Sequence, residues 1–165
     1  MRDLLFQIKK GILSNLYYLS LFAALAIPDI CGALDSEDGQ ASRENYINWF
    51  DKYVAPSYQG YLHGEDCYSF RCALLCQGSA IPSRSRYKKI LFVEPQTMDS
   101  LFHGHVIEDV LNIDVRLFCQ DIIRGVEKWL EEKENTELYK KNMAKFVRRY
   151  PEGLPPYVVG TPVIG

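Results

Sequence analysis

Large apolar residues recur every three or four positions between residues 115 and 130. This spacing restricts the possible folds of the chain more than any other feature of the sequence. On an α-helix, such spacing gathers the apolar side chains on one face, which must pack against other elements. Asp114 stands directly before the stretch, where its carboxylate can cap the first turn. The chain is therefore expected to contain a helix with a buried face, formed by Val115, Phe118, Cys119, Ile122, Val126, Trp129 and Leu130.

Further helices are expected from apolar spacing and from residues typical of helix ends. Pro28 suits a first turn and is expected to end the helix before it, because proline lacks an N–H group and clashes within a helix. Ser42 is a capping residue before an aromatic stripe, and Gly78 favours a helix end because glycine readily adopts the left-handed conformation. The expected helices cover residues 3–26, 28–34, 42–53, 64–77 and 136–150.

Between these helices, the segment ILFVEP is rich in β-branched and aromatic residues and predicts a strand that Pro95 ends. The later segment HGHVIEDVLNI is expected to hold its partner strand in a small β-hairpin. The last segment, PEGLPPYVVGTPVIG, reads as an extended, Pro/Gly-rich tail. The expected fold class is mainly α, with one helical domain over residues 1–150 and a tail over 151–165. The domain is expected to be a bundle of five to six helices with a small β-hairpin insertion.

Composition limits the functions open to the chain. A chain of 165 residues with 47% hydrophobic content can form one domain with its own core. The net charge of −2 offers no overall basic excess, so binding to nucleic acid has to rely on a local patch. The five cysteines form no CxxC pair and no disulfide framework, so the expectation is free thiols in a reducing cytoplasm, with no metal and no cofactor.

The segment KKGILSNLYYLSLFAALAIPDI is the main challenge to a cytoplasmic location. Its two lysines, apolar run and ALA motif resemble a secretory signal peptide. The run from Leu16 to Ile27 is too short to span a bilayer, and two serines and an asparagine interrupt the segment at helical spacing. We therefore expect a buried helix in a cytoplasmic protein without a membrane partner, with export as the alternative.

The stretch CYSFRCALLCQG places Arg71 on an otherwise apolar helix. A guanidinium among Phe, Leu and Cys needs a partner or a chemical task. One interpretation is a structural arginine that pairs with an acid of the same or another helix. Cys76 lies five residues later, about 140° around the helix, so the two side chains are not expected to stack. Tyr68 lies three residues before Arg71 and can touch it, whereas Glu65 and Asp66 lie six and five residues before it.

The run FRCALLCQGS resembles the R-x(4–6)-H motif of the HEPN superfamily (higher eukaryotes and prokaryotes nucleotide-binding). Arg71 takes the arginine position and, after four residues, Cys76 takes the histidine position. The acidic GED before the run and the QGS that ends it are similar to the superfamily's pattern around the motif. The likeness rests on this one helix and on the helical layout of the chain.

The resemblance implies an α-helical bundle that forms a homodimer, with the arginine helices of two chains together. Many HEPN proteins are metal-independent ribonucleases of toxin–antitoxin or phage-defence systems, in which Arg and His act on the scissile phosphate and the 2′-hydroxyl proton. Arg71 suits the phosphate role, since a guanidinium can bind phosphate oxygens in bidentate fashion. Cys76 lacks the second nitrogen of imidazole, and this departure favours a protein without full activity.

Three further residues near the motif are candidate catalytic groups. Glu65 and Asp66 begin the motif helix, and His63 precedes it in a loop that can fold back toward the arginine. His103 and His105 are two apart and would share one face of a strand, but no third metal ligand accompanies them. Among the histidines, His63 is the preferred candidate.

Arg84, Arg86, Lys88 and Lys89 form the most basic segment and are the candidate contacts for phosphates of RNA or a nucleotide. Three functions stay open on these observations. The first, which is the leading expectation, is a HEPN-like ribonuclease that forms a homodimer, with an antitoxin as a candidate protein partner. The second is a catalytically inactive HEPN-like protein that binds RNA, a nucleotide or another protein. The third is a helical interaction module in which Arg71 is structural.

Overall fold

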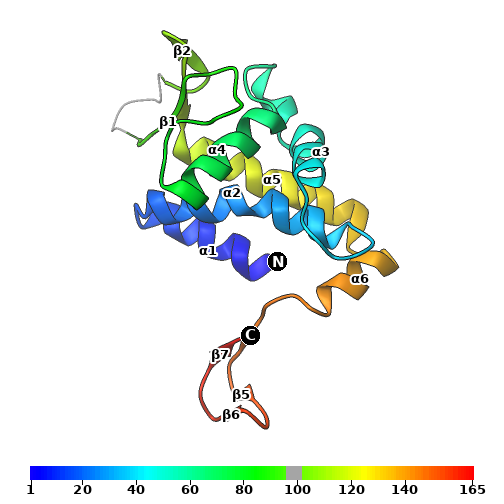
Figure 1. Cartoon of the computed structure of the whole chain (residues 1–165). Helices are drawn as coiled ribbons and strands as arrows, with labels where there is room; N and C mark the ends of the chain where they lie inside the picture. The colour runs from blue at the N-terminus through cyan, green and yellow to red at the C-terminus, as the bar shows by residue number, and fades with distance from the viewer. Residues whose placement is uncertain (96–101) are drawn as a thin grey trace.

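The computed structural model describes residues 1–95 and 102–165, and helices dominate it (Figure 1). The fold is mainly α, as predicted, with 53% of the described residues in helices. A short 3₁₀ helix and small sheets complete it. The helices are α1 (Arg2–Leu13), α2 (Tyr17–Leu34), α3 (Arg43–Tyr53), η1 (Ala55–Tyr58), α4 (Gly64–Gln77), α5 (Val115–Lys133) and α6 (Glu137–Met143).

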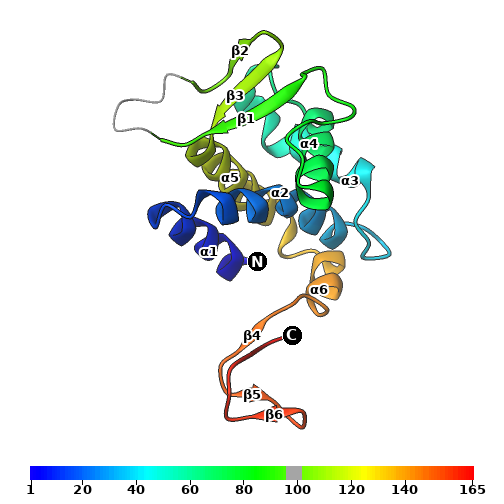
Figure 2. The ribbon, with the colours of Figure 1, turned by 60° about the vertical axis from the view of Figure 1, so that its left-hand side comes forward.

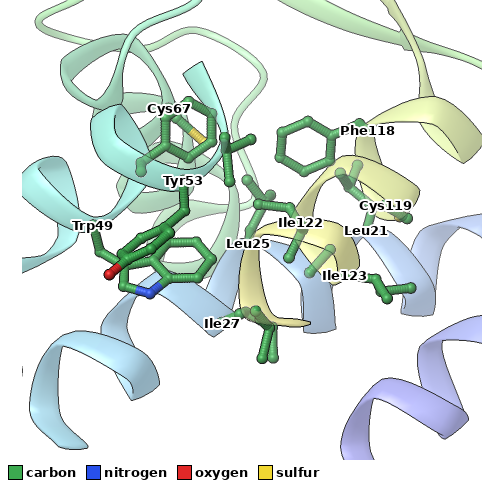
Figure 3. Close-up of a cluster of buried hydrophobic side chains, with 14 of the residues drawn as sticks. Leu21, Leu25, Ile27, Trp49, Tyr53, Cys67, Phe118, Cys119, Ile122 and Ile123 are labelled. Carbon is green, nitrogen blue, oxygen red and sulfur yellow. The ribbon is translucent and has the colours of Figure 1, made fainter. Parts of the chain in front are cut away.

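Helix α2 lies at the centre of the helical part and contacts α1, α3, α4, α5 and α6 (Figures 1 and 2). Its side chains Leu25 and Ile27 are fully buried. They belong to the same apolar cluster as Trp49 of α3 and Ile122 of α5 (Figure 3). All seven residues of the predicted buried face of α5 are buried in this core. Burial of each large apolar side chain stabilises the fold by roughly 1.5–3 kcal/mol, which makes this core the main source of stability.

The prediction of a single helix over residues 3–26 is wrong, because α1 and α2 are separate helices. The chain turns at Ser14–Leu16, where Asn15 adopts a left-handed conformation with φ of 58°. Asparagine is one of the few residues other than glycine that tolerates this conformation. After the turn, α2 packs against α1. A Cβ on Gly11 would collide with the hydroxyl of Ser20, so glycine permits this close approach of the two helices. The apolar spacing continues across both helices, so it gives no signal for the turn between them.

The prediction that Pro28 begins a new helix is also wrong, since Pro28 lies inside α2 and is buried. A proline in a helix interior costs about 3 kcal/mol, because it removes one backbone hydrogen bond and crowds the preceding turn. Packing of α2 against five other helices offsets that cost. The hydroxyl of Tyr46 in α3 also donates to the carbonyl of Leu25, at 3.2 Å, in the turn that precedes the proline.

Local end signals correctly predict α3, α4 and α5. The side chain of Ser42 accepts a hydrogen bond from Asn45 N–H, and the carboxylate of Asp114 accepts from two N–H groups of the first turn of α5. Gly78 ends α4 in the left-handed conformation, with φ of 63°. At the other end of α4, a Cβ on Gly64 would lie 2.7 Å from the carbonyl oxygen of Ile47, so glycine permits the close approach of α4 to α3.

Three short strands form a sheet in the order β1–β3–β2. The predicted strand is present as β1 (Lys89–Val93), but it pairs in parallel with β3 (Val110–Asp114) rather than in a hairpin. The hairpin joins β2 (His105–Ile107) to β3 through Glu108 and Asp109, both at positive φ. Such a two-residue turn usually contains Asn-Gly or Asp-Gly, so a Glu-Asp pair gives a weak sequence signal.

The chain after α6 departs from the prediction in two ways. Helix α6 ends at Met143 rather than near Tyr150. The following residues form two small antiparallel sheets, which pair β4 (Arg149–Tyr150) with β7 (Val163–Ile164) and β5 (Gly153–Leu154) with β6 (Val158–Val159). The expected domain boundary after residue 150 coincides with the end of β4. This C-terminal arm, residues 144–165, extends away from the helices (Figures 1 and 2).

Candidate functional site

Arg71 lies on α4 and binds Asp29 of the central helix α2. The Nε and Nη2 atoms of Arg71 both lie 2.7 Å from Oδ2 of Asp29. Asp29 follows Pro28 in an otherwise apolar run, and both side chains of the pair are mostly buried. The pair therefore joins α4 to α2. This arrangement matches the interpretation of Arg71 as a structural arginine that pairs with an acid of another helix.

The identity of this acid partner escaped the sequence analysis. Asp29 carries the same signal as Arg71, namely a charged residue whose neighbours along the helix are apolar. Two such residues of opposite charge in one domain predict each other as partners, because an unpaired buried charge is costly. That rule would have selected Asp29 over Glu65 and Asp66.

Burial and charge act in opposite directions on this ion pair. Burial raises the pKa of Asp29 above its ordinary value, and the nearby guanidinium of Arg71 reduces this rise. Burial also opposes the charge on Arg71, but Asp29 and Cys72 outweigh it and raise the pKa of the guanidinium. The arginine thus stays a cation, whereas the carboxylate is held in its charged form largely by that one partner.

Arg71 also reaches the two cysteines of the motif helix, contrary to the expectation from helical angles. Its Nη1 atom lies 3.8 Å from Sγ of Cys72 and 4.0 Å from Sγ of Cys76. The angle of about 140° between positions 71 and 76 describes where the side chains start. The long arginine side chain bends across that angle, so the two motif residues do meet. Cys72 is half-buried and Cys76 is exposed.

Tyr68 lies beside the same group, as its spacing from Arg71 predicts. Its ring centroid is 6.0 Å from the guanidinium carbon of Arg71 and 6.0 Å from that of Arg43. Arg43, at the start of α3, forms an ion pair with Glu65 of α4. Glu65 therefore joins α4 to α3 through this ion pair, and it does not pair with Arg71.

Asp66 is the buried anchor of the segment that follows α4. Its carboxylate accepts hydrogen bonds from the hydroxyl of Ser85 at 2.8 Å and from the backbone N–H of Arg86 at 3.2 Å. The Nε atom of Arg86 donates to the same carboxylate at 3.1 Å, and the backbone N–H of His63 donates to it at 3.4 Å. These contacts place Asp66 in a structural role. His63 is the exposed N-cap residue of α4, two helical turns before Arg71.

The basic segment is balanced by acids. Arg86 pairs with Asp66, and the ammonium group of Lys88 lies 2.9 Å from the carboxylate of Asp109. Lys88 and Lys89 line an open surface hollow of ≈ 920 Å³, which Glu108 and Asp109 of the β2–β3 turn also line. The four predicted phosphate contacts therefore lie on a surface of mixed charge, and Arg84 is exposed beside them.

His103 enters a small aromatic group that the sequence did not reveal. Its ring centroid lies 5.6 Å from that of Tyr58 and 6.2 Å from that of Tyr61. Burial lowers the pKa of His103, and Asp121 of α5 opposes this effect. His105 instead begins β2, where its ring contacts Phe102. The two histidines therefore do not share one site.

Two properties of the described residues bear on metal binding and on membrane insertion. Within residues 1–95 and 102–165, there is no group of three or more His, Cys, Asp or Glu side chains arranged to hold a metal ion. One helix, Tyr17–Leu34, is long and apolar enough to cross a membrane, and half of it is buried within the fold. A core helix of a soluble protein and an N-terminal signal sequence both share these properties.

Comparison of the chain with protein-family models, with curated proteins and with solved structures finds no match.

Proposed function

We propose that the chain is a mainly helical, HEPN-like interaction module that associates with a second copy of itself and in which Arg71 is structural. The observation that carries the proposal is the C-terminal arm, which extends away from the helices (Figure 2) and carries exposed apolar side chains. Tyr157 is 83% exposed, and Val159 and Ile164 are also largely exposed. Exposed apolar groups gathered on one projecting segment are typical of a contact surface.

The same chain offers an apolar groove for such an arm. The groove has a volume of ≈ 180 Å³ and lies between β1 and helices α2 and α4, with Tyr18, Phe70, Leu74 and Leu91 among its lining residues. Tyr18 and Leu91 are themselves exposed, so the apolar surface continues out of the groove. Leu19 adds a further exposed apolar side chain one position along α2.

Two features favour a second copy as the occupant. β1 lies at the edge of the described sheet, and an edge strand can accept the backbone of an added strand. The arm already contains short strands with β-branched residues. In addition, exposed Glu94 lines the groove and exposed Arg149 lies in the arm, so the two segments each offer one charge of opposite sign. Each copy would then supply one arm and one groove.

The contacts of Arg71 support a role in stability. Its Nε and Nη2 atoms, the two donors of a side-on bidentate contact with a phosphate, are both engaged by Asp29. A metal-independent ribonuclease stays the second candidate function, because Nη1 of Arg71 lies 4.0 Å from Sγ of Cys76 in the histidine position. A cytoplasmic location, RNA or nucleotide binding and an antitoxin partner stay predictions.

Light scattering after size-exclusion chromatography tests the proposal over a hundredfold range of concentration. The full chain should form a dimer whose fraction rises with concentration. Val159→Asp in the arm and Leu91→Asp in the groove should each shift it to the monomer, whereas Ile107→Asp, on the opposite edge strand β2, should not. A monomer at every concentration, or equal effects of all three variants, would refute self-association.

Incubation with mixed RNA in EDTA tests the second candidate. The wild type, Arg71→Ala and Cys76→His are compared on a gel. We expect no cleavage by the wild type. Cleavage that Arg71→Ala abolishes in a folded protein would overturn the structural role and establish the ribonuclease. Cleavage by Cys76→His alone would indicate a HEPN site that has lost its acid–base residue.

A further inference from the structure

Cys72 and Cys76 form a pair of free thiols one helical turn apart on α4. Residues four apart on a helix face the same side. Both sulfur atoms lie within 4.0 Å of one atom, Nη1 of Arg71, so a single guanidinium contacts the whole pair. Cys76 is exposed and Cys72 is half-buried, and the pair is therefore open to solvent from one side.

The helix holds these two cysteines too far apart for a disulfide. Side chains at this spacing have Cβ atoms about 5–6 Å apart, whereas a disulfide requires about 3.5–4.5 Å. A single ion bound to both sulfur atoms spans a wider gap, because two metal–sulfur bonds of about 2.3 Å replace one S–S bond of about 2.05 Å. An intact α4 thus favours an ion bridge over a disulfide.

The ligand set selects a class of ion. Thiolates are soft ligands that favour Cu(I), zinc and iron–sulfur clusters. Structural zinc almost always takes four protein ligands, and the part of the chain described here holds no group of three or more candidate ligands. Cys67, on the same helix, is buried and contacts the hydroxyl of Tyr46 instead. A pair of thiolates alone suits a soft monovalent ion that accepts two ligands.

Charge around the pair favours the same class. Binding of Cu⁺ by two thiols releases two protons to solvent and leaves a complex with a net charge of −1. The guanidinium of Arg71 can balance that charge through Nη1. Asp29, the acid that pairs with Arg71, binds Nε and Nη2, which lie on the side of the guanidinium away from Nη1. The arrangement therefore places a cation, rather than a free carboxylate, beside the two sulfurs.

We propose that Cys72 and Cys76 bind one soft monovalent metal ion of the Cu(I) class as a pair of thiolates, with Arg71 as the cation that balances the complex. The site lies on one helix of a single chain. It is independent of the proposed self-association and of any action on RNA.

Titration of the reduced full chain with Cu(I), under inert gas and against a chromogenic Cu(I) chelator, tests the site. We expect one ion per chain and an ultraviolet thiolate-to-copper absorption band. Cys72→Ser and Cys76→Ser should each weaken binding at least tenfold. Cys119→Ala is the matched control: it removes a buried thiol from the core of α5 and should leave binding unchanged.

A second pair of variants tests the role of Arg71. Arg71→Gln removes the cation and should weaken binding several-fold. Asp29→Asn breaks the same ion pair but keeps the guanidinium, so it should bind at least as tightly as the wild type. No ion retained against the chelator, one ion per two chains, or retention by the Cys72→Ser/Cys76→Ser double variant would overturn the site. Equal weakening by Arg71→Gln and Asp29→Asn would overturn the role of Arg71.

Discussion

Arg71→Ala is the substitution whose effect on stability can be worked out most closely. The side chains of Arg71 and Asp29 are 25% and 14% exposed. An exposed pair contributes about 0–1 kcal/mol, and removal of one partner of a fully buried pair costs about 3–5 kcal/mol. The intermediate exposure predicts a loss of about 2 kcal/mol. For a chain of 165 residues this lowers the Tm by roughly 4–8 °C.

The loss should depend on pH, because the substitution leaves Asp29 without its cation. Burial already raises the pKa of Asp29, and removal of Arg71 should raise it further. Below that raised pKa, the folded variant carries a proton that the unfolded chain does not bind until lower pH. Proton binding by the folded state alone stabilises it as the pH falls. The destabilisation should therefore be largest near pH 7 and should shrink toward about pH 4.

Urea unfolding of four proteins, as a double-mutant cycle, measures the interaction itself. The wild type, Arg71→Ala, Asp29→Ala and the double variant should give a coupling energy of about 1–2 kcal/mol. Arg43→Ala is the matched control: its pair with Glu65 is more exposed, and its loss should cost less than about 1 kcal/mol. If Arg71→Ala costs no more than Arg43→Ala, or if the cycle is additive, the structural role of Arg71 is refuted.

Two further substitutions test other parts of the fold. Asp66→Ala should cost about 3–4 kcal/mol in urea unfolding, because it leaves Arg86 and the loop donors beside the start of α4 without their buried acceptor; a loss under about 1 kcal/mol would contradict this anchoring role. His103→Gln should flatten the change in urea midpoint between about pH 7.5 and pH 5, because burial lowers the pKa of His103 below the unfolded value of about 6.5 and the folded state loses stability as the pH falls through that range. An identical pH profile in the wild type and the His103→Gln variant would show that His103 contributes nothing to it.

The candidate site was only partly open to prediction from sequence. The apolar neighbours of Arg71 showed that it needs a partner, and its spacing from Tyr68 predicted their contact correctly. The partner Asp29 lies 42 residues away on another helix, and its choice depends on how α2 and α4 cross. Asp66 was a candidate catalyst because it begins the helix, yet its four hydrogen bonds come mostly from a loop that returns to it.

What the sequence by itself determined is local: the mainly α class, the cap at Ser42, the end of α4 at Gly78 and the buried face of α5 all follow from signals within a few residues. Tertiary structure decided the rest. Pro28 stays inside α2 because α2 packs against five other helices, and β1 pairs in parallel with β3, which is not its neighbour in a hairpin. Tertiary structure also decided the contacts of Arg71 with Asp29 and with the two thiols. Each depends on distances between elements, which local propensity and periodicity do not contain.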